Sequence, residues 1–272
     1  SVKYNAIKIL QALVSFHQDD DSLSAFVDAD LKRVGFVYNN SVYPLKDSLY
    51  LQALKNLELR SLKHPVSLEV SHAIANVFVT RAARYKPLVS DENKWHLKTA
   101  YDYCARAIKR FPDSYGAKIC KYQQDIIAAK QLQFTIESFN LPNKSFRALV
   151  SYKNIDTIFF RVIKIEKREF KEKYRDLYNA ELFKKYVSLK PEKEWSELMT
   201  NDWDFQLHTA EIKMPVLPNG DYLILANTHK DFKVAENALF YAFTSMTGIS
   251  YIKRAHDDMI QTFEPAWEAR RP

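Results

Sequence analysis

The acidic residues around Trp203 are the first side chains in this sequence whose types and spacing could do chemistry. Asp202, Asp204 and Glu211 could supply the pair of carboxylates that a glycosidase uses as acid and base. With Trp203 between them, the same acids could instead form a surface that binds sugar. Exposed acids along the edge of a strand explain this spacing more simply, so we expect no catalytic pair here.

Other motifs of catalysis or metal binding are weak. His256-Asp257-Asp258 is a local cluster of histidine and acid, residue types that can hold a metal. Asp19-Asp20-Asp21 lacks the glycine and the distal glutamate of a calcium loop and fits a solvated helix cap. The sequence holds no Gly-rich phosphate loop, no Gly-x-Ser-x-Gly elbow and no His-Glu-x-x-His pair. We therefore expect a protein that is not an enzyme, with no bound metal and no cofactor.

The two cysteines are candidates for a disulfide. Cys104 and Cys120 lie eight residues to either side of Pro112, so a helical hairpin that turns at Pro112 brings them to a similar height. In an oxidising compartment they could form a disulfide. Two buried thiols that pack as small apolar groups are the simpler expectation, because cysteine is among the most buried residue types.

Composition predicts a folded chain with two domains. The 272 residues exceed the usual size of one hydrophobic core, and 47% of them are hydrophobic. The net charge is +7, but the basic residues are spread along the sequence, so we expect no nucleic-acid partner. No apolar run approaches the roughly 20 residues that cross a bilayer. The missing initiating methionine and the ending at Arg270-Arg271-Pro272 suggest a piece of a longer protein.

Residues 1–130 show the apolar periodicity of helices. The run Asp19-Asp20-Asp21-Ser22 is expected to end the first helix and to cap the next one. Ser114 or Asp113 is expected to cap the helix after Pro112, and Pro44 and Pro65 are expected to open helices. A helix is expected to start at Asp91 and to break near Pro112. The first helix should bury an apolar stripe made of Ile7, Leu10, Leu13 and Val14. The helix after Pro44 should bury a second stripe, made of Leu45, Leu49, Leu54, Leu57 and Leu62.

The helical pair between residues 91 and 130 resembles a tetratricopeptide-like repeat, since small residues precede a break at Phe111-Pro112-Asp113-Ser114. The sequence predicts an all-helical, tetratricopeptide-like domain over residues 1–130. Such arrays serve packing and protein contacts more often than chemistry.

From residue 131 the apolar pattern shifts to the period of strands. Residues 157–165 are apolar at both alternating sets of positions, which is typical of a strand covered on both faces. One charged helix is expected over 168–189. The other expected strands are 133–137, 148–152, 204–214, 222–227 and 239–250. The expected fold class is α+β: a helical array, then an antiparallel immunoglobulin-like β-sandwich with an inserted helix over 131–252. Residues 253–272 form a tail or the start of a further domain.

Several stretches of the second domain resemble a macroglobulin-type β-sandwich. The helical region upstream also fits the bacterial alpha-2-macroglobulin-like proteins, in which helices precede the first sandwich. The resemblance covers roughly residues 65–252. The stretches that carry it are Leu141-Pro142-Asn143-Lys144 with residues 149–155, then residues 159–165, 216–226 and 238–252.

The resemblance implies a protease-trapping or defensive role in the cell envelope. Some members use a Cys-Gly-Glu-Gln thioester, but here Ala105 follows Cys104 and Lys121 follows Cys120. The resemblance therefore implies a non-catalytic, structural N-terminal segment that contributes to protease inhibition. Its partners would be proteases or neighbouring domains of the same chain.

A stand-alone module of the envelope is the alternative. Such a module would bind a peptide or a glycan on the helical array or around Trp195, Trp203 and Asp202.

Overall fold

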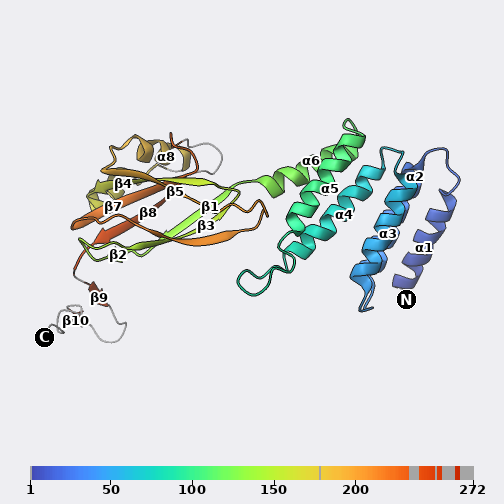
Figure 1. The fold of residues 1–272 in the computed structure, drawn as a ribbon, viewed down its shortest axis with the longest axis horizontal. Helices are drawn as coiled ribbons and strands as arrows, with labels where there is room; N and C mark the ends of the chain where they lie inside the picture. Colours follow the sequence, from blue (N-terminus) through green and yellow to red (C-terminus); the bar gives the residue numbers. More distant parts are fainter. Residues whose placement is uncertain (1, 178, 233–238, 249, 253–260, 264–272) are drawn as a thin grey trace. The chain divides into compact units, whose positions relative to one another are not determined.

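The computed structural model describes residues 2–177, 179–232, 239–248, 250–252 and 261–263 (Figure 1). They form two compact units, which are described separately. The helical unit comprises residues 1–129 and 202–206, and the sandwich unit comprises residues 130–201 and 207–272. The α+β class is confirmed, because helices are followed by two β-sheets. Among the described helices, none has the length and apolar character that crossing a membrane requires.

In its described part, the helical unit is built from six helices (Figure 1). Each helix packs on the next along the chain, and α4 also contacts α2 and α6. Two separate apolar clusters form the core, one among α2, α3 and α4 and the other among α4, α5 and α6. The helices are α1 (Val2–Phe16), α2 (Leu23–Asn40), α3 (Lys46–Ser61), α4 (Ser67–Ala82), α5 (His96–Arg110) and α6 (Tyr115–Ala128).

Two predicted helix caps are confirmed. The Ser22 hydroxyl accepts a hydrogen bond from the Ser24 amide at 3.3 Å, at the start of α2. The Ser114 hydroxyl accepts one from the Ala117 amide at 3.0 Å, at the start of α6. Each cap satisfies a backbone N–H that has no carbonyl partner within its helix, which explains why the helices begin there.

One predicted helix boundary is wrong. Helix α5 begins at His96 rather than Asp91, because Asn93 has a φ angle of 68°, outside the helical region.

The predicted stripe of α1 is confirmed in part. No described side chain of α1 is fully buried, but Ile7, Leu10 and Val14 are half-buried, and Val14 packs against the apolar cluster of α2, α3 and α4. Of the leucines expected on the helix after Pro44, only Leu54 and Leu57 are buried.

Helices α4 and α6 approach each other closely at Gly116. A Cβ atom added to Gly116 would lie 2.4 Å from the Cβ of Leu68 and 2.9 Å from the carbonyl carbon of Leu68. Real atoms do not come this close, so one helix would have to shift. We therefore expect Gly116→Ala to lower the free energy of unfolding by about 1–3 kcal/mol, the usual cost of overpacking a core.

The control is Gly35→Ala in α2, where an added Cβ meets no atom within 4 Å. This half-buried helical site has room for a methyl group and should gain about 0.5–1 kcal/mol, because alanine loses less backbone entropy than glycine. Urea unfolding of both variants, followed by far-UV circular dichroism, measures the difference. Equal effects of the two substitutions would contradict the close contact between α4 and α6.

The sandwich unit contains two sheets that face each other, plus a separate antiparallel pair of short strands, β9 and β10 (Figure 1). One sheet has the order β1-β3-β6 and the other β2-β8-β7-β4-β5. Every pairing is antiparallel except β2 with β8, so the second sheet is mixed rather than purely antiparallel. The strands are β1 (Gln131–Ile136), β2 (Phe139–Asn140), β3 (Arg147–Lys153), β4 (Thr157–Ile165), β5 (Lys193–Leu198), β6 (His208–Lys213), β7 (Gly220–Asn227), β8 (Leu239–Met246), β9 (Ser250–Ile252) and β10 (Gln261–Phe263).

Strand β4 has the predicted bounds and is covered on both faces. Ile158, Phe160 and Val162 pack into the core between the sheets. Ile163 and Ile165 pack on the other face, in a cluster that includes residues of α7 (Lys167–Lys173) and α8 (Asn179–Ser188). The unit therefore has three layers, and the continuous apolar run of β4 follows from its place in the middle layer.

The region after β4 differs from the prediction. The single helix expected over 168–189 is two helices, α7 and α8. Strand β5 was not predicted, because Lys193, Glu194 and Glu197 interrupt the apolar alternation of a strand that lies at the edge of its sheet. The strand expected over 204–214 starts at His208 instead. Most of the predicted tail, residues 253–272, lies outside the described residues.

Candidate functional site

Trp195 is a packing residue of the sandwich. It lies on β5, and its ring stacks on Phe160 with 5.0 Å between centroids and an angle of 15°. It is partly buried against the core between the sheets. Stacking of this kind stabilises the edge of the core, and it leaves only part of the indole available to a ligand.

Asp202 and Trp203 belong to the other unit, since residues 202–206 pack with the helices. Asp202 forms an ion pair with Lys94 at 2.9 Å, and Trp203 is 58% exposed. Two residues further, Phe205 is buried and stacks on Tyr101 with 5.0 Å between centroids. The structure therefore assigns Trp195 and Trp203 to separate units.

Each of the three carboxylates considered for a catalytic pair bonds to another residue of the chain. Asp202 pairs with Lys94, and Asp204 is buried and accepts a hydrogen bond from the Gln206 amide at 2.8 Å. Glu211 pairs with Arg147 across strands β6 and β3 of the sandwich. These partners hold the acids in structural contacts, and Glu211 lies in a different unit from the other two.

Cys104 and Cys120 are free thiols, and both are completely buried between α5 and α6. The Sγ atom of Cys120 lies 3.6 Å from the carbonyl oxygen of Leu68. A hydrogen bond with Cys120, together with burial, raises the pKa of the Cys104 thiol. A raised pKa leaves little thiolate at neutral pH, so this thiol is a poor nucleophile.

We expect neither thiol to react with an aromatic disulfide reagent in the native chain, and both to react once urea unfolds it. Burial excludes the reagent, and the raised pKa of Cys104 suppresses its reactive thiolate. The absorbance of the released thiol measures the reaction. Rapid reaction of the native chain would contradict this expectation.

A buried polar network joins three helices of the helical unit. Glu58 on α3 is 7% exposed and lies against Ser71 of α4 and Tyr103 of α5. The Ser71 hydroxyl donates to Glu58 Oε1 at 2.5 Å, and the Tyr103 hydroxyl donates to Oε2. Arg110 donates to Glu58 Oε1 at 3.1 Å and to Ser71 Oγ at 2.8 Å.

This network is satisfied by its own members, which indicates a structural role. Burial, and then the hydrogen bond to Glu58, raises the pKa of Tyr103, so this hydroxyl stays protonated and keeps donating. Sequence reasoning missed the four residues because they are up to 52 positions apart and share no local motif.

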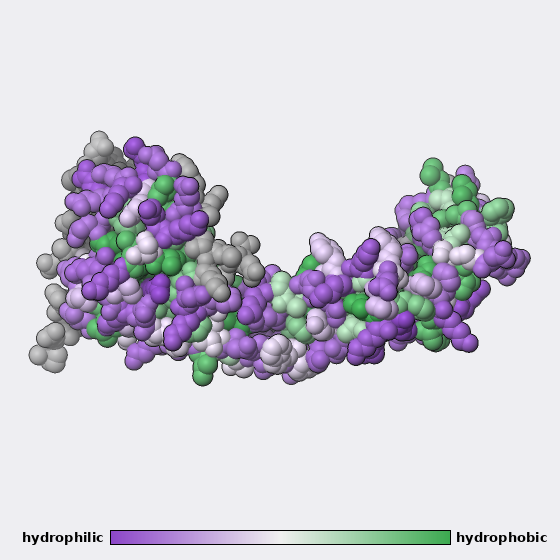
Figure 2. All heavy atoms as spheres, turned by 90° about the horizontal axis from the view of Figure 1, so that it is seen from above, coloured by the Kyte–Doolittle hydropathy of each residue, from purple (hydrophilic) through white to green (hydrophobic). Residues whose placement is uncertain are grey.

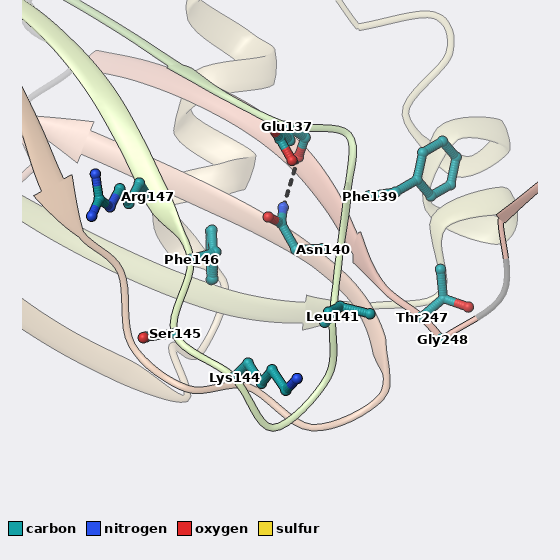
Figure 3. Close-up of a pocket in the computed structure, with 10 residues that line it drawn as sticks. All are labelled: Glu137, Phe139, Asn140, Leu141, Lys144, Ser145, Phe146, Arg147, Thr247 and Gly248. Atoms are coloured by element: carbon teal, nitrogen blue, oxygen red, sulfur yellow. Dashed lines mark hydrogen bonds between the residues drawn. The ribbon is translucent and has the colours of Figure 1, made fainter. Parts of the chain in front are cut away.

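The sandwich unit has a hollow of about 450 Å³ beside strand β2 (Figure 3). It is bordered by the loop that leads from β2 to β3. The backbone N–H of Asn143 in this loop donates a hydrogen bond to the carbonyl oxygen of Leu217 at 2.8 Å, which holds the loop in place. Asn140 fixes the other wall by donating to Glu137 O at 3.0 Å and to Thr244 Oγ1 at 2.9 Å. The lining residues are Glu137, Phe139, Asn140, Leu141, Lys144, Ser145, Phe146, Arg147, Thr247 and Gly248.

The described lining of this hollow contains no histidine and no cysteine. Its carboxylate is that of Glu137, and its hydroxyls are those of Ser145 and Thr247. Its charges are mixed, since Glu137 stands with Lys144 and Arg147 and the last of these pairs with Glu211.

Within the described ranges, no three metal-ligating side chains gather into a group. The cluster His256-Asp257-Asp258 lies outside those ranges.

Comparison with known proteins does not identify the chain. No family model and no curated protein matches it. The CARDB domain of a Pyrococcus furiosus protein, solved with di-metal ions, is 14% identical over 43% of this chain and 91% of that chain, with a TM-score of 0.25. The alkylpurine DNA glycosylase AlkC of Pseudomonas fluorescens, solved bound to DNA containing an abasic site analog, is 7% identical over 88% of this chain and 81% of that chain, with a TM-score of 0.25. At these TM-scores neither match bears on the chain's fold or function.

Proposed function

We propose that the chain is a non-catalytic segment of an alpha-2-macroglobulin-like protein of the cell envelope, and that it acts through protein contacts. The stretches that carry the resemblance lie largely on paired strands. Residues 149–155 are mostly on β3, 159–165 are on β4, and 216–226 lead into and form most of β7. The stretch 238–252 includes the whole of strand β8.

The order of the strands is the observation that carries this proposal. After β1 the chain leaves the first sheet and joins the second as β2, parallel to the last long strand β8. With the strands lettered as in immunoglobulin domains, the sheets read A-B-E and A′-G-F-C-C′. Helices α7 and α8 are then an insertion between C and C′. This order supports an immunoglobulin-like build of the sandwich.

The helical unit supports a role in protein contacts rather than chemistry. Helix α4 contacts both of the alternate helices, α2 and α6, as in stacked helical hairpins of the tetratricopeptide type. The carboxylates of Glu58 and Asp202 and the thiols of Cys104 and Cys120 are held in buried or paired structural contacts. The proposed contribution to protease trapping is therefore to position other domains and to contact partner proteins.

An inhibition assay with the parent protein tests the proposal. Incubation with an endopeptidase should abolish cleavage of a large protein substrate and leave cleavage of a small peptide substrate intact, because a trapped protease excludes only large molecules. The 272-residue chain alone should change neither activity. Unchanged cleavage of both substrates in the presence of the parent protein would contradict a trapping role.

A further inference from the structure

Two adjoining hollows on the helical unit form a groove over α2, α3 and α4, called here the α2–α4 groove. The polar hollow has a volume of about 190 Å³ and is lined by Asn39, Asp47, Asn76, Arg81 and Arg84 among others. The apolar hollow has a volume of about 380 Å³, and its lining includes Val34, Val37, Tyr43 and Leu49. Tyr38 and Tyr50 line both hollows and separate the polar part from the apolar part.

The boundary between the two hollows is fixed by contacts within the protein. The rings of Tyr38 and Tyr50 stack with 4.3 Å between centroids and an angle of 13°. The Tyr38 hydroxyl donates to Asp47 at 3.1 Å, and Arg84 donates to the other oxygen of Asp47 at 3.1 Å. The bond from Arg84 and, to a smaller extent, the bond from Tyr38 lower the pKa of Asp47, so its carboxylate stays charged. Because Tyr38, Asp47 and Arg84 are already held in place by these contacts, a ligand that binds the groove would cost them little side-chain entropy.

The charge of the groove is positive. Its lining holds one carboxylate, Asp47, and four cationic side chains, Arg33, Lys46, Arg81 and Arg84. Arg33 pairs with Asp30, whereas Lys46 and Arg81 donate to the backbone carbonyl oxygens of Ser41 and Asp47 and keep their charge uncompensated by those bonds. Arg84 retains 59% of its side-chain exposure although it pairs with Asp47, so its remaining donors face solvent. Asn39 and Asn76 add carboxamides of the kind that bond to a peptide backbone.

The apolar part of the groove is open to solvent. Val37, Tyr43 and Leu49 are 44%, 54% and 57% exposed, in the same part of the unit. Figure 2 shows hydrophobic residues at the surface of the N-terminal helices, next to strongly hydrophilic ones. Exposed apolar side chains that are rimmed by polar groups are typical of sites that bind other proteins.

We propose that the α2–α4 groove binds an extended acidic peptide segment of a partner protein. A carboxylate of the peptide binds at Arg81 and Arg84, and a neighbouring apolar side chain enters the hollow beyond Tyr38 and Tyr50. Charge complementarity selects the acid, because arginine binds carboxylates with two parallel hydrogen bonds. This inference does not depend on the macroglobulin proposal, since it rests on the helical unit alone.

The probe is a dye-labelled peptide with two aspartates followed by a leucine, flanked by serine and glycine, titrated by fluorescence polarisation. The native chain should bind it at least about tenfold more tightly than the same peptide with asparagine in place of aspartate, since a charge-assisted bond is worth about one such factor. Binding should weaken as salt is added, because the arginine is exposed.

Two variants test the two parts of the groove separately. Arg84→Ala and Leu49→Ser should each weaken binding by about tenfold or more, while circular dichroism shows that the helices are retained. Lys121→Ala on α6 is the matched control, because Lys121 forms an exposed pair with Asp125 away from the groove lining; it should leave binding unchanged. Equal affinity for the aspartate and asparagine peptides would overturn the proposal. So would binding of anionic lipid vesicles, and not of the peptide, in an Arg84-dependent manner.

Discussion

Replacing Phe205 with alanine should lower the free energy of unfolding of the helical unit by about 3–5 kcal/mol, the usual cost of removing a buried phenylalanine ring. Phe205 is 8% exposed and belongs to the apolar cluster of α4, α5 and α6. Its stacking on Tyr101 adds an aromatic contact that alanine cannot make. The measurement is urea unfolding followed by the helical signal of circular dichroism.

Trp203→Ala is the matched control in the same segment. Trp203 is 58% exposed, and both residues have positive φ angles, 58° at Trp203 and 62° at Phe205. The two substitutions therefore share a similar backbone cost and differ mainly in the area that they expose. We expect a change of about 0.5 kcal/mol or less for Trp203→Ala. If Phe205→Ala were equally mild, segment 202–206 would not be part of the helical core.

Replacing Glu58 with alanine should destabilise the helical unit by about 3 kcal/mol, at the lower end of the cost of breaking a buried ion pair. The substitution leaves the hydroxyls of Ser71 and Tyr103 without their acceptor, in addition to the unpaired guanidinium of Arg110. The side chain of Arg110 is 31% exposed, so water compensates part of the lost charge pairing, which argues for the lower end.

The control for Glu58 is an exposed acid in the same unit. Asp125 pairs with Lys121 on the surface of α6, with side chains 61% and 65% exposed. Asp125→Ala should therefore cost about 0.5 kcal/mol or less, because solvent screens such a pair. Chemical unfolding of both variants gives the comparison. A loss at Glu58 no larger than at Asp125 would mean that the network contributes nothing to the packing of α3, α4 and α5.

Local chemistry made part of the fold predictable from sequence. The caps at Ser22 and Ser114 could be predicted, because each serine bonds to an amide only two or three residues further along the chain. Strand β4 was predicted with its bounds, because apolar residues on both faces indicate a strand in a middle layer. The division into helices and then strands follows from the same local periodicity.

Long-range packing explains what the sequence did not predict. Segment 202–206 follows β5 in the chain but packs with the helical unit, through a contact of Phe205 with Tyr101 that no local pattern encodes. The acids near Trp203 were considered as a catalytic pair, and Asp202 instead bonds to Lys94, 108 positions away. The network around Glu58 could not be predicted either, because Arg110 lies 52 positions from Glu58 in the chain. Side chains that meet across more than 50 positions leave no periodic signal.

The parent coding sequence, read on both sides of this chain, tests the central proposal most directly. An alpha-2-macroglobulin-like protein predicts further sandwich domains encoded after residue 272 and a lipoprotein signal encoded before residue 1. A stop codon directly after Pro272 would contradict that proposal and would leave a helical and sandwich binding module as the remaining account.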